Sequence, residues 1–256
     1  RHITFTPPPP LAPRDIGAQH AQFPDLLRLL EAGIQNIWIT GPSGSGKTYA
    51  AHALADSLSR PFHSHGACLT SYDLLGFIDA GGTYHSTEFR RAYEHGGIAC
   101  LDEIDSWSPA ATLALNEALA NGSAPFPDKR VPRHPDCTII ACANTYGLGA
   151  TSTYVGRNRL DAAFLDRFGA KLEWTYDWAL TRSLLPSEDL ATQWCARVRS
   201  ASDAARANAM QIAITPRAAL EGYKLLRSGI APDAVADMTY AFGLTAQQRT
   251  QLTQTA

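Results

Sequence analysis

A glycine-rich stretch near the amino end of the chain has the residue types that bind phosphate. Residues 41–48 read GPSGSGKT and match the phosphate-loop pattern G-x-x-x-x-G-K-[ST] at every position. The glycines let successive backbone N–H groups point inward at phosphate oxygens, and the lysine adds a charge near the β and γ phosphates. The sequence therefore predicts a site for ATP phosphates formed by Gly41, Pro42, Ser43, Gly44, Ser45, Gly46, Lys47 and Thr48.

An apolar run that ends in two acids supplies the second part of the predicted site. Residues 98–101 are apolar, and Asp102 and Glu103 follow them directly. We expect Thr48 and Asp102 to ligate Mg²⁺, and Glu103 to polarise the attacking water. Asp105 comes soon after, and we expect it to cap the next helix.

These groups can meet only if the elements before them form a parallel sheet. Short apolar runs typical of buried parallel strands alternate with helical patterns. We expect strands at residues 34–40, 97–101, 138–143 and 170–176, and helices at 48–58, 113–120 and 159–165. The helix after the phosphate loop adds its positive amino end to the anion site. The predicted fold class is α/β: a P-loop NTPase parallel sheet flanked by helices, followed by a small all-helical lid domain.

The chain divides into three predicted segments. Residues 1–14 contain Pro7–Pro10 and Pro13, so they form an extended arm or linker. Residues 15–177 form the ATPase core. Residues 178–256 form the lid, with helices expected at 189–210, 216–226, 231–242 and 245–253.

Composition limits the class of protein and its partners. The 256 residues are 45% hydrophobic and 18% charged, with a net charge of −2. This balance is ordinary for a globular protein and lacks the basic surplus of a dedicated nucleic-acid binder. The five cysteines show no metal-ligand spacing, so we interpret them as reduced thiols. No apolar run reaches the length of a membrane span, and we expect a cytoplasmic protein with no membrane partner.

Two further motifs resemble elements of AAA+ ATPases. Residues 138–144 (TIIACAN) are similar to the sensor 1 strand, which implies that Asn144 holds the attacking water together with Glu103. Residues 215–218 (TPRA) resemble sensor 2, which implies that Arg217 contacts the γ phosphate. A turn residue after a strand and a proline-started helix are the structural alternatives for these two motifs.

Residues 160–168 (LDAAFLDRF) resemble the Leu-Asp-Arg-Phe stretch of the MoxR, CbbQ and CobS-like ATPases. The resemblance implies that Arg167 is an arginine finger that enters the site of a neighbouring subunit. Arg157 and Arg159 are upstream alternatives for this role. An ordinary ion pair of Arg167 with Asp161 or Asp166 is the structural alternative.

Two other segments resemble parts of the MoxR and dynein-related ATPases. Residues 81–97 are similar to a segment in which the second helix is interrupted by an insert that faces the ring's pore. Residues 121–135 resemble the hairpin that precedes sensor 1. The resemblance covers residues 15–228.

The leading functional hypothesis is a homo-oligomeric, hexameric ring ATPase that remodels or activates a protein client as a chaperone. The resemblance further implies a partner with a von Willebrand A domain. The alternative is the motor subunit of a nucleic-acid-processing complex, similar to McrB-type NTPases. A subunit that binds ATP only to assemble is a third reading. A small-molecule kinase or a GTPase is disfavoured, since the kinase has no use for the sensor motifs and the chain has no Asn-Lys-x-Asp guanine signature.

Overall fold

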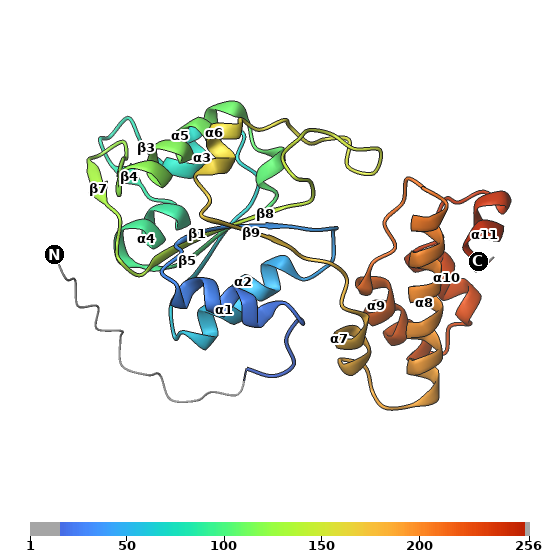
Figure 1. Ribbon diagram of the computed structural model, residues 1–256. Coiled ribbons are helices and arrows are strands. Elements are labelled where there is room, and N and C mark those ends of the chain that lie inside the picture. The colour runs from blue at the N-terminus through green and yellow to red at the C-terminus, as the bar shows by residue number, and fades with distance from the viewer. Residues whose placement is uncertain (1–15, 254–256) are drawn as a thin grey trace.

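Five parallel strands form the central sheet of the computed structural model, which describes residues 16–253 (Figure 1). In spatial order the strands are β2 (Phe62–His65), β5 (Gly97–Leu101), β8 (Cys137–Ala143), β1 (Asn36–Thr40) and β9 (Ala170–Glu173). Nearly all residues of the three central strands are buried, because helices cover both faces of the sheet.

The register of the sheet brings three strand ends to one edge. Thr40 of β1 pairs with Ala143 of β8, and Leu101 of β5 pairs with Ala141 of β8. Because the strands are parallel, the residues that follow β5, β8 and β1 leave the sheet side by side. The two acids, the amide and the phosphate loop predicted from the sequence therefore share this edge.

Alternate strand residues pack against helices on opposite faces. On one face lie α1 (Phe23–Glu31) and α2 (Lys47–Ser57). On the other face lie α3 (Ser71–Leu75), α4 (Glu88–His95), α5 (Pro109–Ala120) and α6 (Ala162–Asp166). Within β1, Ile37 and Ile39 join the apolar cluster of the first face, and Trp38 joins that of the second. This period of two is the one expected of a strand covered on both sides.

Two antiparallel hairpins extend from the second face. One pairs β3 (Phe77–Ile78) with β4 (Tyr84–His85), and the other pairs β6 (Ser123–Pro125) with β7 (Arg130–Pro132). The second hairpin confirms the prediction for residues 121–135. A short 3-10 helix, η1 (Ile104–Ser106), follows the acids after β5.

From Trp178 onward, every regular element in the described part of the chain is a helix. The helices are α7 (Trp178–Ser183), α8 (Asp189–Ala207), α9 (Pro216–Arg227), α10 (Pro232–Thr239) and α11 (Ala246–Thr253). They share an apolar core of their own, which includes Trp194 and Tyr223, and they lie beside the sheet (Figure 1). The predicted fold class is confirmed. The boundary near residue 177 stays a prediction, and the proposed proline-rich arm lies outside the described residues.

Several element limits differ from the prediction for local reasons. The helix expected at 159–165 begins at Ala162, because Asp161 caps it by accepting the N–H of Ala163 at 2.9 Å. The strand expected at 170–176 ends at Glu173. Within residues 16–253, no helix combines the length and the apolar character needed to cross a bilayer.

Candidate active site

The phosphate loop connects β1 to α2, as predicted, and its glycines meet two steric requirements. Gly44 and Gly46 have φ values of 75° and 90°, a region that residues with a Cβ rarely adopt. Gly41 is needed for space, since a Cβ there would lie 1.9 Å from the carbonyl oxygen of Trp174. The loop can therefore follow its path only with glycine at these positions.

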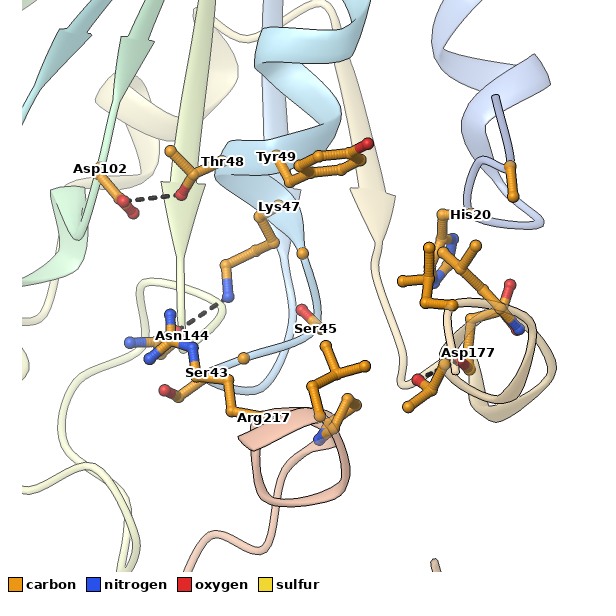
Figure 2. Close-up of a pocket in the computed structure, with 18 of the residues that line it drawn as sticks. His20, Ser43, Ser45, Lys47, Thr48, Tyr49, Asp102, Asn144, Asp177 and Arg217 are labelled. Atoms are coloured by element: carbon orange, nitrogen blue, oxygen red, sulfur yellow. Dashed lines mark hydrogen bonds between the residues drawn. The ribbon is translucent and has the colours of Figure 1, made fainter. Parts of the chain in front are cut away.

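Lys47 lies inside the loop with only 7% of its surface exposed. Its Nζ donates to the carbonyl oxygens of Gly41 at 2.6 Å and Pro42 at 3.0 Å, and to Oδ1 of Asn144 at 2.9 Å (Figure 2). Burial lowers the pKa of Lys47, and the nearby Asp102 carboxylate opposes that shift. The loop thus holds a desolvated cation next to the end of β8.

Thr48 and Asp102 bring two hard oxygen ligands together at the first turn of α2. The Thr48 hydroxyl donates to Oδ2 of Asp102 at 2.7 Å (Figure 2). Hydroxyl and carboxylate oxygens are the donor set that Mg²⁺ prefers. In the same loop the Ser45 hydroxyl is buried without a hydrogen-bond partner in the described part of the chain. These residues fit a site for Mg²⁺ and phosphate oxygens.

Glu103 follows Asp102 in a backbone conformation that non-glycine residues seldom adopt. Its φ is 50° and its ψ is 36°, in the left-handed region. Its side chain is 53% exposed, and Oε2 lies 3.5 Å from Nη1 of Arg157. Strained backbone of this kind is concentrated at functional sites. Glu103 therefore combines an unusual backbone conformation with a half-exposed carboxylate that lines the cavity.

The prediction that Asp105 caps the following helix is wrong. Asp105 is fully buried, and its Oδ2 accepts N–H bonds from Asn144 at 3.0 Å and Thr145 at 2.9 Å. The cap of α5 is Ser108, whose hydroxyl accepts the N–H of Ala111 at 3.2 Å. Asp105 instead connects the acids after β5 to the end of β8.

Arg217 reaches the site from the helical region. It lies in the first turn of α9, where Thr215 caps the helix by accepting the Arg217 N–H at 3.2 Å. Its side chain lines the cavity together with the phosphate loop (Figure 2). The helix approaches the loop closely, since a Cβ on Gly44 would lie 2.9 Å from Thr215. The helical region therefore forms one wall of the site.

The cavity between the sheet edge and the helices has a volume of about 480 Å³. One end holds the phosphate loop, Asp102, Glu103 and Asn144. The other end is lined by residues from the amino-terminal segment, α7 and α9, namely Ala18, His20, Asp177, Leu180, Thr181, Leu184 and Leu220. This volume and mixture of apolar and polar lining suit a ligand of nucleotide size.

Sequence reasoning missed the second end of the cavity. His20 is buried, stacks on Trp174 with ring centroids 4.2 Å apart, and has Nε2 at 2.9 Å from the Thr175 carbonyl. Asp177 caps α7 and also accepts the N–H of Ala21 at 2.9 Å. These contacts join segments more than 150 residues apart in the chain, and no local motif indicates them.

Sequence reasoning also missed two tyrosines that bind the phosphate loop from outside. The Tyr154 hydroxyl accepts the N–H of Ser43 at 2.9 Å, and the Tyr176 hydroxyl donates to the carbonyl of Ser43 at 2.9 Å. Both the backbone N–H and the backbone C=O of Ser43 are thus hydrogen-bonded. Tyr176 lies just before α7, the first helix of the helical region. Its hydrogen bond therefore ties the phosphate loop to the segment that connects the sheet to these helices.

Arg167 lies at the opposite end of β1 from the phosphate loop. Its carbonyl accepts a hydrogen bond from Asn36, the first residue of β1, at 3.1 Å. At about 3.3 Å per residue, β1 separates this position from the loop by roughly 13 Å. The exposed guanidinium of Arg167 donates to Oδ1 of Asn116. Within the described residues it forms no ion pair with Asp161 or Asp166. Arg167 therefore does not enter the cavity of its own chain.

The two alternative arginines have different surroundings. Arg157 has a side chain that is 12% exposed, and it contacts Glu103 and Asp105 of its own chain. Arg159 is exposed, and its backbone forms an isolated antiparallel bridge with Leu148.

Comparison with known proteins identifies related sequences. A family model described as "AAA domain (dynein-related subfamily)" matches residues 36–168. An uncharacterized protein of Staphylococcus saprophyticus is 27% identical over 166 residues, which are 60% of this chain and 60% of that protein. An uncharacterized protein of Staphylococcus aureus is 28% identical over 147 residues, 52% of this chain and 53% of that protein. The chain thus spans 60% or less of the length of these curated relatives.

Solved structures share the fold. The RuvB Holliday junction branch migration motor of Thermotoga maritima matches with a TM-score of 0.55 and 20% identity, over 86% of this chain and 68% of that chain. NtrX of Brucella abortus, solved in complex with ATP, matches with a TM-score of 0.55 and 18% identity, over 85% and 54% of the two chains. At these identities the likeness shows the fold alone.

Proposed function

Because the chain belongs to the AAA domain family, in its dynein-related subfamily, we propose that it binds ATP with Mg²⁺ and hydrolyses it to ADP and phosphate. One observation carries this proposal: the phosphate loop, Asp102, Glu103 and Asn144 line one end of a single cavity that Arg217 also lines. These are the groups that phosphoryl transfer to water requires.

The phosphate loop holds the triphosphate in this proposal. Its backbone N–H groups and the amino end of α2 face the phosphate oxygens, and Lys47 neutralises their charge. Thr48 and Asp102 hold Mg²⁺, which offsets the negative charge of the β and γ phosphates when bound. The apolar end of the cavity, near His20 and Leu180, receives the base.

Glu103 and Asn144 act on the attacking water. Glu103 orients the water and accepts its proton, and the Asn144 amide holds it in line with the γ phosphorus. Arg217 contacts the γ phosphate from α9, so that phosphate release changes the contact between the helices and the sheet. This coupling is what a motor needs in order to convert hydrolysis into movement.

Arg167 completes the site of a neighbouring subunit. It is exposed and lies at the far end of β1, so it can reach a phosphate only in another copy of the chain. A planar, permanently charged guanidinium suits the charge that develops on the transferred phosphoryl group. The proposed assembly is a closed, hexameric homo-oligomer, in which each cavity lies between two subunits.

The proposed client is a protein. We assign the chain to the MoxR, CbbQ and CobS-like group of cytoplasmic chaperone ATPases, some of which act with a von Willebrand A domain partner. The β3–β4 hairpin is the proposed pore-facing insert, and Phe77 and Ile78 on it are each 46% exposed. Apolar side chains on such a hairpin would grip an extended polypeptide. The nucleic-acid motor has no support from the net charge of −2.

Steady-state ATP hydrolysis measured against protein concentration tests the ring and its shared site. We expect specific activity to rise cooperatively with concentration, and Glu103→Gln and Arg167→Ala each to lose it. Mixing these two variants should restore turnover, because an Arg167→Ala subunit keeps Glu103 and receives Arg167 from its Glu103→Gln neighbour. Arg91→Ala, which removes an exposed arginine paired with Glu88 on α4, is the matched control.

Activity that is independent of concentration and survives Arg167→Ala would exclude the shared site. Hydrolysis that DNA stimulates in a salt-dependent way would favour the nucleic-acid motor over a protein client.

A further inference from the structure

One loop of the core, residues 151–158, reaches back to its own active site at two points. Tyr154 accepts the backbone N–H of Ser43 in the phosphate loop. Three residues later, Nη1 of Arg157 lies 3.3 Å from Oδ1 of Asp105 and 3.5 Å from Oε2 of Glu103. The same loop leads into α6, and Arg167 is the residue that follows its last residue, Asp166. Arg157 and Arg167 are thus close in sequence, but Arg157 lies at the active site of its own chain and Arg167 lies at the far end of β1.

Asp105 fixes the place of Arg157. This carboxylate has no exposed surface, and its Oδ2 already accepts the N–H groups of Asn144 and Thr145 and the Thr145 hydroxyl at 2.8 Å. Its other oxygen faces Arg157. Leaving a buried carboxylate without an opposite charge is costly, so Arg157 is held against it. The charge of Arg157 is near enough to Lys47 to help lower the pKa of that lysine, after the larger effect of burial.

The Glu103 carboxylate faces Arg157 at 3.5 Å. The carbonyl of Glu103 accepts bonds from the N–H of Ser106 at 2.8 Å and from its hydroxyl at 2.7 Å, which pins the backbone. The carboxylate itself is half exposed, and in residues 16–253 its one ion-pair partner is Arg157. Arg157, held in turn by the buried Asp105, is thus the fixed cation that the Glu103 carboxylate faces.

We propose that Arg157 acts within its own subunit as the positioning residue of Glu103, with Asp105 as its anchor. The inference rests on the proposed ATPase function and deepens it. Through Asp105 the same network holds the backbone of Asn144, so the two groups assigned to the attacking water are oriented by one buried carboxylate. A finger role in the neighbouring subunit would pull Arg157 away and leave Asp105 buried without its cation.

The Arg157→Ala variant should lower kcat for ATP hydrolysis on the order of 10-fold to 100-fold, the scale expected when a catalytic group is misplaced by about 1 Å. KM for ATP should change less than about 3-fold, since a loss confined to kcat marks an interaction made in the transition state. Arg157→Lys, which keeps the charge beside Asp105, should recover part of kcat. Unchanged kcat in Arg157→Ala, or a loss confined to KM, would overturn the proposal.

Mixing experiments separate action within a subunit from action between subunits. Glu103→Gln subunits retain Arg157 and Arg167 but cannot hydrolyse ATP. Added to Arg167→Ala, they should restore turnover. Added to Arg157→Ala, they should not, because the damaged Arg157 and the intact Glu103 belong to the same site. Recovery in the second mixture would show that Arg157 acts between subunits and would refute the proposal.

Two further measurements keep the result interpretable. Thermal melting with and without ADP shows whether Arg157→Ala folds and binds nucleotide. If it does not fold, the double variant Arg157→Gln with Asp105→Asn removes the unpaired buried charge. Its kcat is then compared with that of Asp105→Asn alone, which keeps Arg157, and the same fold-loss is expected relative to that reference. A wild-type chain without ATPase activity would contradict the proposed function itself, whereas recovery in the Arg157→Ala mixture contradicts this inference alone.

Discussion

Lys47 donates a hydrogen bond from Nζ to Oδ1 of Asn144 at 2.9 Å, which joins the start of α2 to the end of β8. The contact spans 97 residues of sequence and places the lysine proposed to bind phosphate beside the amide proposed to hold the attacking water. Since two loop carbonyls accept the other hydrogen bonds of Nζ, all three donors of the ammonium are paired. Asn144 is thus oriented by Lys47 through its side chain and by Asp105 through its backbone.

The Asn144→Ala variant tests this arrangement. It removes the amide but leaves Lys47 its two carbonyl acceptors, so ATP should still bind. We expect kcat to fall on the order of 10-fold to 100-fold with little change in nucleotide affinity, since the lost contact acts on the water. Asn121→Ala, at the exposed end of α5, is the control. An Asn144→Ala enzyme with wild-type kcat would remove Asn144 from the catalytic group.

Gly41→Ala tests the close approach of the phosphate loop to β9. The new Cβ would lie 1.9 Å from the Trp174 carbonyl oxygen, a backbone atom that cannot move without disturbing the sheet. We expect the free energy of unfolding to fall by about 1–3 kcal/mol or more, as in overpacked cores. Gly66→Ala, where a Cβ meets nothing within 4 Å, should change it by less than about 1 kcal/mol. Equal denaturation midpoints for the two variants would contradict this reading.

His20→Ala tests whether the amino-terminal segment helps to bind the base. The substitution removes the ring that stacks on Trp174 and lines the cavity. A loss of about 0.5–1.5 kcal/mol corresponds to a KM for ATP raised about 2-fold to 10-fold, with kcat nearly unchanged. The control is His95→Ala, on an exposed histidine of α4. An effect on kcat with constant KM would place His20 outside the binding surface for the base.

Glu94 gives the fold a predictable dependence on pH. Hydrogen bonds from Arg90 and Lys129 lower the pKa of Glu94 from 4.5 to about 2. Because the folded-state pKa lies below the unfolded value, the stabilisation is complete above about pH 5 and is lost as the pH falls from 4.5 toward 2. Its size should be about 1–2 kcal/mol, since water screens the partly exposed pair.

Chemical denaturation of wild type and Glu94→Gln between pH 7 and pH 2.5 measures this contribution. The difference in unfolding free energy should be largest at pH 7 and should shrink at acid pH. The Glu221→Gln variant, whose exposed ion pair with Lys224 is screened by water, should show a smaller difference. A difference that stays constant with pH would mean that Glu94 acts through packing and not through its charge.

The parts of the fold predicted correctly depend on local patterns. The phosphate loop is one continuous stretch between a strand and a helix. A single local pattern therefore predicts both its residue types and its place in the fold. Asp102 and Glu103 follow an apolar strand in the same way. The edge strand β2 was missed, because its sequence FHSH has no apolar run and its place depends on pairing with β5. Asp105 was misassigned because its position just before a helix suggested a local cap. Its carboxylate instead accepts the N–H of Asn144 at the end of a distant strand.

The sequence by itself determined the residue types of the phosphate loop and its two acids, their spacing and their strand–loop–helix context. The proposed ATP chemistry rests on these local features. Only the tertiary structure decided where each arginine lies. Arg157 meets Asp105, 52 residues away, inside its own site, whereas Arg167 contacts Asn36 at the far end of β1. Ten residues of sequence separate these arginines, yet the turn of the chain through α6 sends them to opposite ends of the sheet. Side chains of distant segments pair because the backbone brings them together and because an unpaired buried charge is costly. The spacing of residues within a local motif predicts neither of these.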